Sequence, residues 1–151
     1  MTRAHERAKP LLRLLIVEDD PVREQTFRTW LPPDVQPVVA RSAGRALGIL
    51  RRDPGRVYAG ILLDHDLQGQ IASEADRFLT GQDVVRAILR YVSPDVPVLV
   101  HSMNASQSVL MVNVLATAGF EVTKIPMEAL TQPSFLAWLQ EVRDWAEEAQ
   151  R

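Results

Sequence analysis

The chain has 151 residues, of which 46% are hydrophobic and 24% are charged, with a net charge of −2 at pH 7 and no cysteine. This length is typical of one globular domain, and the charge gives no electrostatic case for DNA, RNA or an anionic membrane as the main partner. The lack of cysteine excludes thiol catalysis, cysteine-ligated zinc and disulfides, and it fits a cytoplasmic protein. No run of about eighteen apolar residues is present, so we expect no membrane span.

The sequence divides into a short tail and one domain. Residues 1–10 are basic but lack the apolar core of a signal peptide, so we interpret them as a disordered tail. Residues 11–148 are expected to form the domain. Because the sequence ends with a predicted helix, we expect no separate output domain, and the output would be a protein contact or the chemistry itself.

The first half of the domain alternates apolar runs with helix signals. Residues 11–17 predict a buried strand, and Asp20 before Pro21 predicts the start of a helix. Residues 35–40 predict a strand at a sheet edge, since Pro37 cannot donate to a ladder. The first helix is expected to bury Val22, Phe27, Trp30 and Leu31, and the second, capped by Ser42, to bury Ala43, Ala46, Leu47 and Leu50.

The second half continues the alternation. Predicted strands cover residues 58–63, 97–100 and 120–125, and predicted helices cover 82–92, 106–118 and a final segment that opens at Pro133. The third helix is expected to bury Val84, Val85, Ile88 and Leu89, and the last to bury Phe135, Trp138, Leu139, Val142 and Trp145. Five strands alternating with five helices predict an α/β fold with right-handed crossovers. We expect a flavodoxin-like, doubly wound parallel sheet of order 2-1-3-4-5 with helices on both faces.

Polar side chains follow the predicted strands where each one ends. They are Glu18 and Asp19 after the first strand, Asp64, His65 and Asp66 after the third, His101, Ser102 and Asn104 after the fourth, and Lys124 on the fifth. In an open α/β sheet, ligands bind at this edge. Converging carboxylates suit Mg²⁺, and a hydroxyl and an ammonium suit phosphoryl oxygens. The alternative is that the aspartates only cap turns and the histidines are structural.

This arrangement resembles the receiver domains of two-component response regulators. The resemblance implies that Asp64 is the phosphoacceptor, that Ser102 is the switching hydroxyl and that Lys124 is the lysine of the fifth strand. It also implies that Glu18 and Asp19 are the acidic pair that binds Mg²⁺ with Asp64, while Asp66 supplies a backbone carbonyl. In the family a proline usually follows the lysine directly, whereas Ile125 stands between Lys124 and Pro126 here.

A narrower resemblance points to one branch of that family. Asp64-His65-Asp66-Leu67 and His101-Ser102-Met103-Asn104 are similar to the signatures of the cyclic-phosphate processing receivers, a branch proposed to have phosphoesterase activity. Two imidazoles on opposite sides of a scissile phosphate could act as general base and general acid. This resemblance implies catalytic roles for His65, His101 and Asn104.

The sequence is therefore compatible with three functions. The first is a stand-alone receiver in which a sensor kinase or small phosphodonor phosphorylates Asp64 with Mg²⁺. The second is a phosphoesterase that opens a cyclic nucleotide or the cyclic phosphate of an RNA end with His65 and His101. The third is a degenerate receiver that serves only as a docking module.

The predicted helix 106–118 is apolar on more than the one stripe that a surface helix needs. We therefore expect a homodimer or a partner contact through this helix, the fifth strand and the fifth helix. The alternative is that the loop 68–80 or the tail covers the helix.

Overall fold

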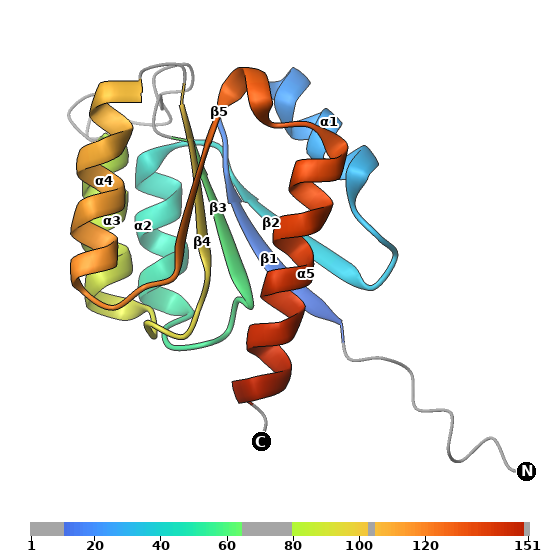
Figure 1. The fold of residues 1–151 in the computed structure, drawn as a ribbon. Coiled ribbons are helices and arrows are strands. Elements are labelled where there is room, and N and C mark those ends of the chain that lie inside the picture. Colours follow the sequence, from blue (N-terminus) through green and yellow to red (C-terminus); the bar gives the residue numbers. More distant parts are fainter. Residues whose placement is uncertain (1–10, 65–79, 103–104, 150–151) are drawn as a thin grey trace, which may run out of the picture.

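The computed structural model describes residues 11–64, 80–102 and 105–149. Its centre is a parallel sheet of five strands in the order β2-β1-β3-β4-β5, which confirms the predicted flavodoxin-like arrangement (Figure 1). The strands are β1 (Leu12–Val17), β2 (Val35–Ala40), β3 (Gly60–Asp64), β4 (Val98–Ser102) and β5 (Val122–Pro126). Strand β2 lies at an edge, as Pro37 predicts.

Helices cover both faces of this sheet (Figure 1). They are α1 (Pro21–Trp30), α2 (Ala43–Arg52), α3 (Gly81–Tyr91), α4 (Ala105–Thr117) and α5 (Gln132–Ala149), with a 3-10 turn η3 (Met127–Ala129) before α5. Local caps fix where helices begin: Asp20 accepts a hydrogen bond from the Val22 amide at 2.8 Å, and Ser42 accepts one from the Arg45 amide at 3.1 Å. None of the helices in the described ranges is long and apolar enough to cross a membrane.

Two hydrophobic cores lie on either side of the sheet. Helices α2, α3 and α4 pack on one face around Leu63 and Val100, and helices α1 and α5 pack on the other around Leu62 and Leu99. Strand β3 is buried along its whole length. Burial of each leucine side chain stabilises the fold by about 1.5–3 kcal/mol relative to exposure. Because the central strands are anchored in this way, the residues that follow them have fixed positions.

Three of the residues expected in the core are exposed instead. Val22 is 72% exposed because it lies five residues before the buried Phe27, about 140° around helix α1. Leu89 is 37% exposed at the border of the buried face of α3. Trp145 is 36% exposed because the last turns of α5 run past the amino-terminal edge of the sheet.

Gly60 allows close contact between β3 and α5. A Cβ atom at Gly60 would lie 2.9 Å from Cγ2 of Val142, whose β-branched side chain is buried and stiff. We expect Gly60→Ala to lower the free energy of unfolding by about 1–3 kcal/mol, measured by urea denaturation. Gly48→Ala is the matched control: nothing lies within 4 Å of a Cβ there, so stabilisation by about 0.5–1 kcal/mol is expected in this helix interior. A Gly60→Ala variant as stable as the wild type would contradict this packing.

Helix α4 keeps apolar side chains at its surface. Val109, Leu110 and Val114 are 41%, 59% and 45% exposed, while Met111 and Leu115 are buried against the sheet. This agrees with the expectation that part of the helix stays exposed, and the homodimer through α4, β5 and α5 remains a prediction. The alternative covers were the loop 68–80 and the tail 1–10. Residues 68–79 of that loop and the whole tail lie outside the described residues.

Candidate functional site: an acidic triad at the sheet edge

Three carboxylates meet at the carboxyl ends of β1 and β3. Val17 pairs with Leu63 in the parallel register, so Glu18 and Asp64 leave the two neighbouring strands side by side. One oxygen from each of Glu18, Asp19 and Asp64 lies within 4.8 Å of the others. The side chains of Glu18 and Asp64 are fully buried, and that of Asp19 is 7% exposed. We call these three residues the acidic triad.

The acidic triad needs a positive charge nearby. Two carboxylates about 4–5 Å apart repel by about 3–4 kcal/mol at the effective dielectric constant of a protein surface, and burial adds a desolvation cost. Carboxylate oxygens are hard donors of the kind that Mg²⁺ binds, usually one or two carboxylates together with several waters. The side chains that were predicted to bind the metal are therefore brought together by the fold and fit a divalent ion.

Arg23 on α1 places its guanidinium against the acidic triad. Its Nε lies 3.0 Å from Glu18 Oε1, and its Nη2 lies 3.1 Å from Glu18 Oε2, 3.2 Å from Asp64 Oδ2 and 3.8 Å from Asp19 Oδ1. Its Nη1 also reaches Asp20 Oδ2 at 3.3 Å. Burial opposes the charge of Arg23, but the hydrogen bond with Glu18 and the surrounding carboxylates outweigh burial and raise the pKa of the guanidinium above its ordinary value.

The sequence prediction missed Arg23. The one local signal was its position three residues after the N-cap Asp20, a spacing at which side chains meet on a helix face, and this spacing does not indicate the contact with the acidic triad.

His101 lies on the same sheet face as Asp64, directly across the register of β3 and β4. Its side chain is fully buried, with Nε2 3.6 Å from Glu18 Oε1. The Phe27 ring packs against it edge-on, with 5.7 Å between ring centroids. His101 is therefore in contact with the acidic triad through Glu18.

Ser102 and Lys124 come from the next two strands. Ser102 is the last residue of β4 and is buried, and Lys124 lies on β5 in register with Val100. Because strand residues alternate between faces, both lie on the face opposite to Asp64 and His101, near the same sheet edge. The remaining predicted site residues, His65, Asp66 and Asn104, lie outside the described residues.

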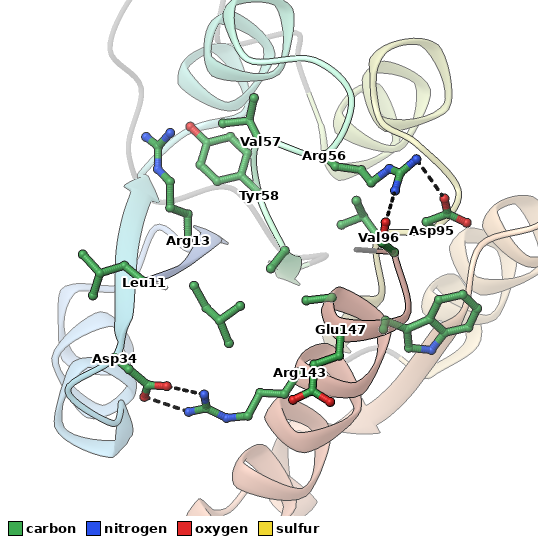
Figure 2. A pocket seen from close by; sticks show the side chains of 15 residues that line it. Leu11, Arg13, Asp34, Arg56, Val57, Tyr58, Asp95, Val96, Arg143 and Glu147 are labelled. Carbon is green, nitrogen blue, oxygen red and sulfur yellow. Dashed lines mark hydrogen bonds and ion pairs between the residues drawn. The ribbon is translucent and has the colours of Figure 1, made fainter. Parts of the chain in front are cut away.

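A separate pocket of about 570 Å³ lies at the opposite, amino-terminal edge of the sheet (Figure 2). Its charged side chains neutralise one another, since Arg143 pairs with Asp34 and Arg56 pairs with Asp95. The Arg13 guanidinium lies over the Tyr58 ring, 5.3 Å from its centroid. Three arginines and three acidic residues line the pocket, Glu147 among them, so their charges balance and the acidic triad is the better candidate site for an ionic ligand.

Solved structures share this fold. The chain matches a CheY-like response regulator receiver domain from Methanospirillum hungatei JF-1 at 19% identity, covering 91% of this chain and 98% of the other, with a TM-score of 0.68. It also matches the receiver domain of a sensor histidine kinase from Pseudomonas aeruginosa PAO1, which holds a magnesium ion in its active-site cleft. That match has 20% identity, covers 86% of this chain and 95% of the other, and has a TM-score of 0.64. The fold is thus that of response regulator receiver domains.

Comparison with protein families identifies one branch of receiver domains. The family described as "Cyclic-phosphate processing Receiver domain" matches residues 13–117, more than half of the chain. The chain belongs to this family of receiver domains. A search of the curated proteins found no match.

Proposed function

We propose that the chain is a Mg²⁺-dependent phosphoacceptor that carries a phosphoryl group on Asp64 in a phosphorelay. The observation that carries this proposal is the acidic triad, in which Asp64 ends a buried central strand and meets the two carboxylates after β1 within 4.8 Å. Membership of a receiver family supports the same assignment. A sensor kinase or a small phosphodonor is the proposed source of the phosphoryl group.

The proposed reaction is one transfer at phosphorus. A carboxylate oxygen of Asp64 attacks the phosphorus, and the bond from phosphorus to the leaving atom of the donor breaks. That atom is the nitrogen of a phosphohistidine on a kinase or the acyl oxygen of acetyl phosphate, and it leaves with the electron pair. Glu18, Asp19 and Asp64 would hold the Mg²⁺. When bound, Mg²⁺ would offset part of the negative charge of the acidic triad and of the phosphoryl oxygens. By resemblance to the family, Ser102 donates a hydrogen bond to a phosphoryl oxygen and Lys124 pairs with another.

Labelling with acetyl phosphate tests this function. The wild type is expected to gain the mass of one phosphoryl group in the presence of Mg²⁺, and the modification should be stable in acid and labile in base, as an acyl phosphate is. Asp64→Asn should gain none because an amide is a poor nucleophile. Asp95→Asn, an exposed aspartate whose partner is Arg56 on the pocket side, is the matched control and should be labelled like the wild type. A folded wild type that stays unlabelled at saturating Mg²⁺ would refute the proposal.

A second function is favoured by two specific observations. The matching family is described as cyclic-phosphate processing, and His101 lies in the same register row as Asp64. In this function the acidic triad would hold a metal ion, and the substrate phosphate would be bound through that metal. The substrate is a cyclic nucleotide or the cyclic phosphate at an RNA end. One imidazole of His65 and His101 takes a proton from the attacking water, and the other protonates the ring oxygen that leaves phosphorus.

A further inference from the structure

Arg23 occupies the donor atoms that a metal would use. Its guanidinium lies 3.0–3.2 Å from both oxygens of Glu18 and from Asp64 Oδ2. Mg²⁺ binds carboxylate oxygens at about 2.0–2.1 Å and demands octahedral geometry. A divalent ion on these oxygens would lie close to the guanidinium, and the two cations would repel each other. Arg23 cannot keep all its present contacts in the metal-bound site.

The structure also provides a second position for the guanidinium. Its Nη1 already lies 3.3 Å from Asp20 Oδ2, and the Asp20 side chain is 36% exposed at the start of α1. The Arg23 side chain is itself 27% exposed, so rotation toward solvent needs no movement of the backbone. Asp20 is fixed by its bond from the Val22 amide at 2.8 Å. A displaced Arg23 would therefore keep one carboxylate partner.

We propose that Arg23 is an internal counter-ion that sets the metal affinity of the acidic triad: a divalent cation displaces its guanidinium from Glu18 and Asp64 toward Asp20. The inference rests on the proposed function, because it assumes that the acidic triad is the metal site. Without metal, Arg23 stabilises the buried carboxylates. With metal, part of the binding free energy is spent on breaking its ion pairs, so the affinity of the wild type is lower than the carboxylates alone would give.

Calorimetric titration of Mg²⁺ into wild type and variants tests this inference. Arg23→Ala is expected to bind Mg²⁺ about tenfold more tightly, within the usual range of coupling between two sites. Without metal, its melting temperature should be lower than that of the wild type, and Mg²⁺ should restore it. Arg23→Gln, which keeps hydrogen-bond donors but no charge, repeats the test if the alanine variant does not fold. Equal or weaker binding by a folded Arg23 variant would overturn the inference.

Arg28→Ala is the matched control. Arg28 lies on the same helix and its loss changes the net charge equally, but it pairs with Glu24 at 3.0 Å and not with the acidic triad. The Mg²⁺ affinity of Arg28→Ala should equal that of the wild type. A gain in affinity as large as that of Arg23→Ala would show that the effect comes from the overall charge, and it would overturn the inference. Asp64→Asn separates the two proposals: if Mg²⁺ binding survives Asp64→Asn, or if no variant binds Mg²⁺, the site itself is misplaced and both proposals fail.

Discussion

Mg²⁺ at a hundredfold excess over its dissociation constant should raise the free energy of unfolding by about 2.7 kcal/mol, and Asp64→Asn should remove most of this gain. The reason is that the acidic triad brings three carboxylates within 4.8 Å of one another and a cation relieves their repulsion. Asp64 is fully buried between its neighbours, so its loss removes a central ligand. Thermal and urea denaturation with and without the metal measure the difference.

The control is Asp95→Asn, measured by the same denaturation experiments with and without Mg²⁺. Asp95 lies at the amino-terminal edge of the sheet, away from the acidic triad. Its metal-dependent gain should equal that of the wild type. If Asp64→Asn keeps the full gain, or if both aspartate variants lose it, the metal does not bind at the acidic triad.

Removal of either His65 or His101 should slow cyclic-phosphate hydrolysis by about 10²–10⁴-fold if the second proposed function is correct. A 2′,3′-cyclic nucleotide is the substrate to use, and the wild-type rate should follow a bell-shaped pH profile because one imidazole must be neutral and the other protonated. Initial rates for His65→Ala and His101→Ala, together with folding checked by circular dichroism, give the result.

His5→Ala is the matched histidine control because His5 belongs to the predicted tail. Its rate should equal that of the wild type. Hydrolysis that survives in the variant lacking both His65 and His101 would rule out their acid–base roles. The His101→Ala variant also tests a structural role, because His101 Nε2 lies 3.6 Å from Glu18 Oε1. If this variant loses both the stabilisation by Mg²⁺ and the hydrolysis rate, His101 positions Glu18.

The fold could be predicted from the sequence because its signals are local and agree with one another. The apolar run 11–17 and the run before Asp64 predicted strands buried on both faces, and Pro37 predicted an edge. Ser42 and Thr80 begin α2 and α3 by direct hydrogen bonds to the backbone. Gly119, with φ of 96°, follows α4 in the left-handed conformation that glycine adopts easily.

The convergence of Glu18, Asp19 and Asp64 also followed from the sequence, since parallel neighbouring strands end at the same edge. Their contact with Arg23 did not, because it depends on the direction of α1 relative to β3 and on a side-chain rotamer. The exposure of Val22 has the same origin: the helical period allows more than one buried face until the packing against the sheet is known.

Mapping the phosphorylated residue tests the central claim most directly. After treatment with acetyl phosphate and Mg²⁺, borohydride reduces an aspartyl phosphate to homoserine with release of inorganic phosphate, and peptide mass spectrometry locates the converted residue. The account predicts homoserine in place of Asp64, with Asp53, Asp66 and Asp95 unchanged. Conversion at any other aspartate with Asp64 intact would contradict it.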